Sequence, residues 1–246
     1  MKVALVTGAS SGIGEATARR LDRDGWRLLL VARRADRVEA LAGELRDADA
    51  LPLDLTEHDA PARARERAQR EGALHLLVNN AGAAWRARFG GDDGGWENVR
   101  RTMEINFDAV LRLTEALLPL LRASAPSSIV NVSSTAGRIA RPGVGAYSAS
   151  KFALAGWSEA LHYEEAEHGV HVGNVLPGFV ATEGFPQEQL TRSARTRWMV
   201  SKPETVAEAI VQAGPGGKAE RYVPRAYGLV PVLRSALPGV VRRVVG

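Results

Sequence analysis

Short apolar runs alternate along the chain with longer segments in which apolar residues recur every three or four positions. The runs have the length of buried strands and lie at Val3–Val6, Leu28–Val31, Ala50–Leu53, Leu74–Val78, Ser128–Val132, Val170–Leu176 and, more weakly, Arg221–Val223. The segments between them predict amphipathic helices over residues 15–25, 35–46, 61–71, 96–121, 148–166 and 203–213. Strands separated by such helices form right-handed βαβ units. We therefore expect an α/β fold with one doubly wound parallel sheet of about seven strands and helices on both faces.

Two predicted loops, residues 82–95 and 178–186, follow the carboxyl ends of strands, where open α/β sheets bind ligands. The loops and the residues just beyond them contain large apolar side chains: Trp85, Phe89, Phe179, Phe185, Trp198 and Met199. This composition predicts an apolar pocket under a mobile lid, or residues that simply anchor the loops. The last of the predicted helices starts with Pro203, and Ser201 is its expected N-cap.

A glycine- and serine-rich segment joins the first predicted strand to the first helix. Gly8, Gly12 and Gly14 lack the Cβ atoms that would hold a ligand away from the backbone, and a helix N-terminus favours anions. The segment therefore indicates a pyrophosphate site, although glycine serves other tight turns as well.

A set of three residues in the middle of the chain forms a candidate acid–base site. Tyr147 and Lys151 lie four residues apart at the start of a predicted helix, so their side chains share one face. Ser134 ends the fifth predicted strand, thirteen residues before Tyr147. A nearby ammonium lowers the pKa of a phenol from its reference value of about 10, and the serine hydroxyl can hold a substrate oxygen. Each of these residues alone would be explained as a packing or capping residue. Their occurrence together at these spacings favours a catalytic role.

At this point the sequence resembles the short-chain dehydrogenase/reductase family. The resemblance covers about residues 2–215 and rests on motifs in the family's order, namely 7–14, 79–82, Asn106, Ser134, 147–151 and 177–182. It implies a single Rossmann-like domain, over residues 1–223, and an NAD(P)-dependent reaction that interconverts a carbonyl compound and an alcohol. The sequence does not name the small-molecule substrate, which we expect to be apolar.

The resemblance also implies a role for each motif residue. Tyr147 exchanges a proton with the substrate oxygen, Ser134 hydrogen-bonds that oxygen, and Lys151 binds the nicotinamide ribose. Asn106 holds a water that continues a proton relay to Lys151, and Thr182 with the Val180 backbone holds the carboxamide. The implied cofactor-binding residues are Gly8, Ser10, Ser11, Gly12, Ile13, Gly14, Arg33, Arg34, Asp54, Leu55, Asn80, Ala81, Gly82, Tyr147, Lys151, Pro177, Gly178, Val180 and Thr182. No metal site is predicted.

The end of the second predicted strand favours NADP(H) over NAD(H). An NAD enzyme places an acidic residue here to bind the ribose 2′-hydroxyl, whereas this chain has Ala32, Arg33 and Arg34. A guanidinium pairs with a 2′-phosphate and stacks on adenine. We expect Arg33 in this role, with Ser10 as a helper, while Arg34 is the more readily explained as a solvated residue. Asp54 should meet the adenine amino group.

Composition narrows the remaining possibilities. The chain has no Cys, which removes disulfides, thiolate nucleophiles and iron–sulfur clusters. Its 32 basic and 28 acidic residues give a net charge of +4, but no basic run carries interleaved aromatic residues, so we expect no nucleic-acid partner. No signal or membrane-spanning segment is visible, and we expect a cytoplasmic protein. A cofactor-binding protein without activity is the alternative, but such family members lack the Tyr or the Lys.

The family also implies a homodimer, or a tetramer, in which two long helices pair across a two-fold axis. Their apolar and small residues either form that contact or face the sheet; they are Val99, Met103, Val110, Leu113, Leu117, Phe152, Ala153, Gly156, Trp157 and Ala160. The sequence departs from the family at His75, where many members have Asp. It also lacks the Val-Asp-Gly-Gly tail of many tetramers, because Val223 is followed by Pro224-Arg225-Ala226.

Residues 224–246 form a basic amphipathic tail. From residue 221 onward the chain has five arginines and no acidic residue, and apolar residues recur at helical spacing at 229, 233, 237, 240 and 244. Pro231 and Pro238 should divide the tail into short helices. We expect the apolar stripe to pack on the domain or on the second subunit, with peripheral contact to an anionic membrane as the further alternative.

Overall fold

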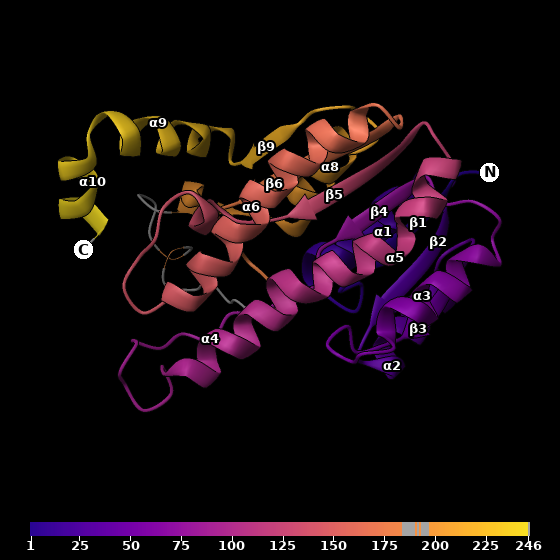
Figure 1. Cartoon of the computed structure of the whole chain (residues 1–246), viewed down its shortest axis with the longest axis horizontal. Coiled ribbons are helices and arrows are strands. Elements are labelled where there is room, and N and C mark those ends of the chain that lie inside the picture. Colours follow the sequence, from indigo (N-terminus) through magenta and orange to yellow (C-terminus); the bar gives the residue numbers. More distant parts are fainter. Residues whose placement is uncertain (184–189, 191, 193–196, 246) are drawn as a thin grey trace.

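The computed structural model describes residues 1–183, 190, 192 and 197–245, and it confirms the doubly wound parallel sheet (Figure 1). Seven parallel strands run in the order β3 (Ala48–Pro52), β2 (Arg27–Ala32), β1 (Val3–Thr7), β4 (Leu76–Asn79), β5 (Ser127–Val132), β6 (Val170–Pro177) and β9 (Glu220–Val223). The chain order reverses between β1 and β4, which makes their carboxyl ends the expected place for a ligand. The two-residue strands β7 (Phe179–Val180) and β8 (Val200–Ser201) pair beyond that edge.

Helices cover both faces of the sheet because successive strand residues point to opposite sides. On one side, Ala4, Val6 and their neighbours pack against α1 (Gly12–Arg23), α2 (Ala35–Glu44) and α8 (Pro203–Ala213). On the other side, Val3, Leu5 and their neighbours pack against α3 (Ala60–Gln69), α5 (Ala109–Ala123) and α6 (Gly145–Ala166). Val110, Leu113 and Leu117 are buried, so these three residues serve the core of the subunit and not a contact between subunits.

The predicted helix over 96–121 is a continuous helix that is interrupted by a π-helical segment. It consists of α4 (Trp96–Met103), a π-helical segment (Glu104–Asp108) and α5. The predicted 15–25 and 148–166 helices start earlier than expected, at Gly12 and Gly145, because first-turn residues need no intrahelical partner for their N–H groups. Ser201 lies in β8 and is not the N-cap of α8; Lys202 occupies that position without a side-chain cap.

The C-terminal tail forms an arm of two short helices, α9 (Leu229–Ala236) and α10 (Pro238–Val245). Figure 1 shows both helices at the end of the molecule where β5 points, on the side opposite the N-terminus. Pro238 begins α10 as predicted, whereas Pro231 lies in the first turn of α9 and does not divide it. No helix in the described part of the chain combines the length and apolar character needed to cross a membrane.

The apolar stripe of the arm is not covered by the chain's own domain, which corrects one of the two packing alternatives. Five side chains are between 48 % and 63 % exposed: Leu229, Val232, Leu233, Leu237 and Val240. The residues of α9 that contact the rest of the domain are others: Val230 lines a cavity, and Arg234 contacts the loop before α6. The side chain of Val244 lies outside the described residues.

Candidate active site

A cavity of about 960 Å³ opens at the carboxyl edge of the sheet, where β1, β4, β5 and β6 end. It brings together most of the predicted site residues, namely Gly8, Ser10, Ser11, Gly12, Ile13, Arg33, Arg34, Leu55, Asn80, Ala81, Gly82, Ser134, Tyr147, Lys151, Pro177, Gly178, Val180 and Thr182. Gly14, Asp54 and Asn106 do not line it. Residues more than 170 positions apart thus meet in one space, as the predicted topology requires.

The glycine-rich loop forms the floor of this cavity. Gly8 and Gly12 have φ values of +67° and +57°, which residues with a side chain rarely adopt. A Cβ atom on Gly14 would lie 2.1 Å from the Gly8 carbonyl oxygen, so Gly14 permits the close packing of loop and helix. Ser11, the N-cap residue of α1, provides no side-chain cap, and the first-turn amides of α1 are left for another acceptor. These features fit a cofactor pyrophosphate.

Thr7 and Asn80 fix the point where the strand order reverses. The Thr7 hydroxyl accepts hydrogen bonds from the backbone amides of Asn80 and Ala81 at 2.9 and 3.0 Å. The Asn80 side chain donates to the Thr7 carbonyl oxygen at 2.9 Å. Asn80 therefore supports the glycine loop, and Thr7 is a supporting residue that the predicted site left out.

The two arginines after β2 occupy different positions. Arg34 donates to the hydroxyl of Ser11 at 2.7 Å and to that of Ser10 at 3.1 Å. Arg33 is 69 % exposed, with its Nη1 atom 3.8 Å from Asp54. Ser10, predicted as a helper beside Arg33, is thus a partner of Arg34, because the turn into α2 directs the second guanidinium across the glycine loop. Both arginines line the cavity.

Asp54 is held by its own turn. Its Oδ1 atom accepts hydrogen bonds from the Thr56 amide at 3.0 Å and from the Thr56 hydroxyl at 2.7 Å. Leu53, Leu55 and Thr56 line the cavity, whereas Asp54 does not. The predicted contact between Asp54 and an adenine amino group therefore stays a prediction.

Ser134, Tyr147 and Lys151 converge at the opposite end of the cavity. Tyr147 lies in the first turn of α6, and Lys151 follows one turn later with its Nζ atom 5.9 Å from the centre of the Tyr147 ring. The Lys151 ammonium donates to the Val132 carbonyl oxygen at 2.9 Å. Ser134 donates to the Pro177 carbonyl oxygen at 3.3 Å and hydrogen-bonds the Tyr147 side chain. Ser133, by contrast, is bound to the Lys151 carbonyl oxygen.

Burial dominates the protonation of this cluster. It raises the pKa of the Tyr147 phenol, although the hydrogen bond from Ser134 and the charge of Arg141 act in the opposite direction. Burial also lowers the pKa of Lys151 to about 8. The expectation that Lys151 lowers the pKa of Tyr147 does not hold for the protein alone, because desolvation is the largest effect on both groups. Tyr147 is therefore a protonated phenol at neutral pH and can donate its proton.

Asn106 lies behind the cavity wall, in the π-helical segment. Its side chain accepts from the Ala83 amide at 2.9 Å and donates to the Ala83 carbonyl oxygen at 2.8 Å and to the Ser150 hydroxyl at 3.1 Å. A Cβ atom on Gly82 would lie 2.7 Å from its Oδ1 atom. Asn106 thus fixes the loop after β4 against α6; its predicted part in a proton relay is not tested by these contacts.

Several residues that line the cavity were not predicted from the sequence. Tyr227 and Val230 of the C-terminal region line the wall beside Met199, and a Cβ atom on Gly178 would lie 1.9 Å from the Tyr227 ring. Ile139 and Val144 also line it. Of the predicted aromatic loop residues, Trp85 and Phe179 line the cavity, Phe89 is 81 % exposed outside it, and Phe185 and the Trp198 side chain lie outside the described residues.

Comparisons with known proteins agree with this geometry. The family model for short chain dehydrogenases matches residues 2–192. The putative oxidoreductase SadH of Mycobacterium tuberculosis is 34 % identical over 99 % of this chain and 94 % of its own length. A short chain dehydrogenase from Burkholderia cenocepacia, solved in complex with NADP, has a TM-score of 0.80 and 31 % identity over 90 % of this chain and 95 % of its own. An alcohol dehydrogenase from Thermococcus sibiricus, complexed with 5-hydroxy-NADP, has a TM-score of 0.75 and 29 % identity over 85 % and 88 %.

Proposed function

This chain belongs to the short-chain dehydrogenase family, and we propose that it is an NADP(H)-dependent oxidoreductase that interconverts a ketone or aldehyde and the corresponding alcohol. The observation that carries the proposal is the single cavity that joins the glycine loop to Ser134, Tyr147 and Lys151. One end of this cavity fits a dinucleotide phosphate, and the other end holds a hydroxyl, a phenol and an ammonium for acid–base chemistry.

The bound nicotinamide would supply or accept the hydride, which none of the protein side chains can do. Ser134 would hold the substrate oxygen beside the phenol of Tyr147. Because burial raises the pKa of Tyr147, the phenol carries the proton that the oxygen takes up during reduction. Lys151 places a positive charge next to the tyrosinate that is left and would contact the ribose.

The preference for NADP(H) is supported by the two arginines and by the absence of an acidic residue at the end of β2. Arg34 lies over Ser10 and Ser11, and Arg33 is exposed at the cavity edge. Both line the cavity from the turn between β2 and α2. The NADP bound to the Burkholderia cenocepacia neighbour is in line with this preference.

The activity is tested by NADPH oxidation against a panel of ketones, aldehydes and quinones. Tyr147→Phe should lower kcat by roughly 10³-fold and leave NADPH affinity nearly unchanged, because general acid catalysis contributes about 10²–10⁴-fold. Lys151→Ala should reduce both. Cofactor binding without turnover of any compound would support the alternative of an inactive, cofactor-sensing protein, and an active Tyr147→Phe enzyme would remove the catalytic assignment.

The cofactor preference is tested by replacing the arginines separately. Arg33→Ala and Arg34→Ala should each lower kcat/KM for NADPH by about tenfold or more, since a hydrogen bond to a charged group contributes about 1.5–3 kcal/mol. Values for NADH should change little. A larger loss for Arg34→Ala than for Arg33→Ala would match the contacts of Arg34 with the glycine loop. Equal losses with both cofactors would count against the preference.

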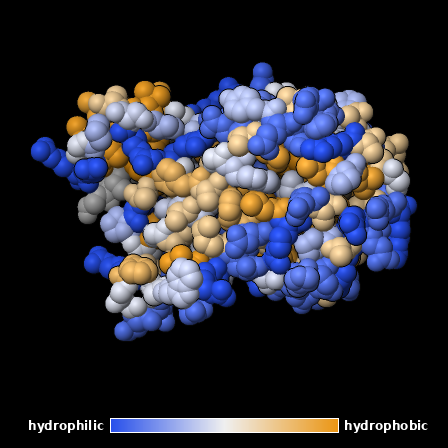
Figure 2. Space-filling view, viewed as in Figure 1, coloured by the Kyte–Doolittle hydropathy of each residue, from blue (hydrophilic) through white to orange (hydrophobic). Residues whose placement is uncertain are grey.

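We also propose a homodimer that uses the outer face of α6. Gly156 and Ala160 are exposed there and Trp157 is half-buried. Figure 2 shows a band of apolar residues over α5 and α6 on this face of the molecule. Small residues allow two helices to approach closely. Light scattering at micromolar concentration should give twice the mass of the chain; a clean monomer refutes the dimer.

The arm has a role in the proposed enzyme, because Val230 of α9, together with Tyr227 just before the arm, completes the cavity wall. Its exposed apolar row beside several arginines also favours peripheral contact with an anionic membrane as a second, weaker function. Sedimentation of the intact protein with anionic but not with neutral liposomes would support this contact.

A further inference from the structure

A second, smaller hollow adjoins the active-site cavity. We call it the arginine groove; it has a volume of about 510 Å³ and lies between α10 and the loop before α6. Three arginines are among its lining residues, Arg141, Arg234 and Arg242, and no acidic residue lines it. The remaining wall is largely apolar, with contributions from Ile139 and Val241.

The three guanidiniums carry charges that the described part of the chain does not neutralise. None of them forms an ion pair with a described residue, whereas the neighbouring Arg138 pairs with Glu220. Two are held in place by aromatic rings: Arg141 lies 5.0 Å from the ring centre of Phe179, and Arg234 lies 4.9 Å from that of Phe152.

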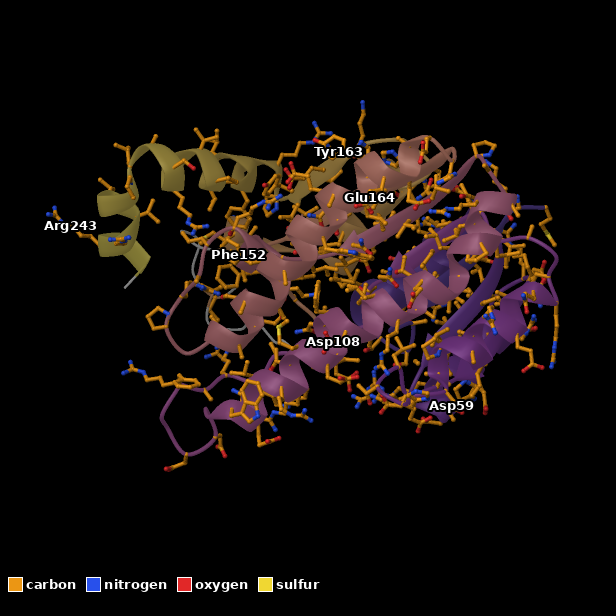
Figure 3. The ribbon with its side chains drawn as sticks, viewed as in Figure 1. Asp59, Asp108, Phe152, Tyr163, Glu164 and Arg243 are labelled. Atoms are coloured by element: carbon orange, nitrogen blue, oxygen red, sulfur yellow. The ribbon has the colours of Figure 1, made fainter. Side chains whose placement is uncertain are left out.

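Arg234 is fixed by a second contact as well, because it donates to the Arg138 carbonyl oxygen at 2.7 Å. Figure 3 shows Phe152 on the stretch of α6 that lies nearest the arm. Three arginines without an ion pair among the described residues, two of them held in place, beside apolar walls are the composition of a site for an amphipathic anion.

The groove lies next to the active site. Ile139 and Arg141 line both the groove and the large cavity. The charge of Arg141 also acts on the phenol of Tyr147, which places this guanidinium within electrostatic reach of the reacting oxygen. The two hollows therefore lie side by side, with Ile139 and Arg141 at their common border.

We propose that the arginine groove binds the anionic end of the substrate, a carboxylate or a phosphate, while the carbonyl group of the same molecule lies at Tyr147. The proposal rests on the oxidoreductase function and adds a substrate class to it: amphipathic carbonyl compounds with an apolar chain and a terminal anion. Arg242 contributes to the groove from α10, so the arm takes part in substrate selection.

The kinetic test uses straight-chain aldehydes of increasing length, each as the free carboxylate and as its methyl ester. The wild-type enzyme should prefer the acid over the ester by about tenfold or more in kcat/KM at one chain length, as hydrogen bonds to a charged group predict. Arg242→Gln should remove this preference through a higher KM with nearly unchanged kcat. Added salt should weaken it, because the groove is open to solvent.

Arg243→Gln is the matched control. Arg243 is the next residue on α10, is exposed, does not line the groove, and points away from the body of the molecule in Figure 3. This variant should keep the preference for the acid. Equal turnover of acid and ester by the wild-type enzyme, or equal effects of the two substitutions, would overturn the proposal.

A binding experiment separates this proposal from the proposed activity. Octanoate, octyl phosphate and the neutral methyl octanoate, none of which carries a ketone, aldehyde or alcohol group, are titrated calorimetrically into the wild-type protein and both variants. Binding of either anion but not of methyl octanoate, lost in Arg242→Gln alone, supports the groove even if no carbonyl compound is turned over. The tighter of the two anions identifies the head group. Absence of anion binding beside normal turnover of neutral aldehydes would leave the activity in place and refute the groove.

Discussion

Replacing Lys151 with Met should stabilise the fold while abolishing activity. Lys151 is 4 % exposed, and its Nζ atom has one hydrogen-bond partner in the described structure, the Val132 carbonyl oxygen. Met has a similar shape and no charge, so the substitution removes a buried ammonium without leaving a large cavity.

The size of the effect follows from the pKa of Lys151, which burial lowers from 10.5 to about 8. At about 1.4 kcal/mol per pKa unit, the charged side chain costs the native state about 3 kcal/mol at neutral pH. Loss of the hydrogen bond to Val132 offsets about 1 kcal/mol of the gain. The net increase in the free energy of unfolding is then roughly 2 kcal/mol, or roughly 4–8 °C in Tm for a chain of this size.

The stabilisation by Lys151→Met should decrease as the pH rises. Below about pH 8 the lysine is charged in both the folded and the unfolded chain, so the native state carries the full cost of burying the charge. Between about pH 8 and 10.5 the folded chain loses the proton while the unfolded chain keeps it, and the cost falls. The stabilisation by Lys151→Met should therefore be largest at pH 7 and close to zero near pH 10.

Urea unfolding followed by circular dichroism, at one protein concentration and at both pH values, measures this difference. Lys218→Met is the control, because Lys218 is exposed and its replacement should have no comparable pH dependence. A variant that is less stable than the wild type at pH 7, or equally stabilised at pH 7 and pH 10, would show that the charge of Lys151 carries no burial cost.

Three further changes test other parts of the structure. Gly14→Ala should destabilise the fold by about 1–3 kcal/mol and weaken NADPH binding, because its Cβ would lie 2.1 Å from a loop carbonyl oxygen; Gly43→Ala, whose Cβ meets nothing within 4 Å in α2, is the control in thermal unfolding. Arg122→Gln should lower stability at pH 7, by less than the loss of a fully buried pair because Arg122 is exposed to solvent, since it leaves the buried Glu165 carboxylate without its partner. That pair lowers the pKa of Glu165, so its contribution is present above pH 4.5 and is lost as the pH falls further; urea unfolding at pH 7 and pH 4 should show a smaller difference at pH 4. Truncation after Val223 removes one cavity wall and should reduce steady-state activity, and a fully active truncated enzyme would contradict that role for the arm.

The motifs were visible in the sequence because each depends on local spacing. A spacing of four positions from Tyr147 to Lys151 places both on one face of any α-helix, and glycines after a first strand indicate a tight turn wherever the strand lies. The order of strands and helices followed from hydrophobic periodicity for the same reason, and the structure confirms it with shifts of a few residues at the ends of elements.

The pKa shifts and the contact partners were decided by tertiary structure. The sequence places an ammonium near a phenol, but the cavity buries both, and desolvation reverses the expected shift at Tyr147. Arg33 and Arg34 are neighbours in sequence, and only the path of the turn decides that Arg34 lies over the glycine loop. Such outcomes depend on distances between segments, which spacing along one chain does not contain.

By itself, the sequence determined the class of fold and the family and singled out the candidate acid–base residues, because these depend on local periodicity and on motifs that share one sheet edge. Only the tertiary structure decided that the C-terminal arm reaches the cavity, that Tyr227 packs against Gly178, and that Arg242 meets Arg141 across a groove. The physical reason is that an amphipathic helix specifies which of its faces is apolar, while its neighbour is set by where the rest of the folded chain leaves room for it.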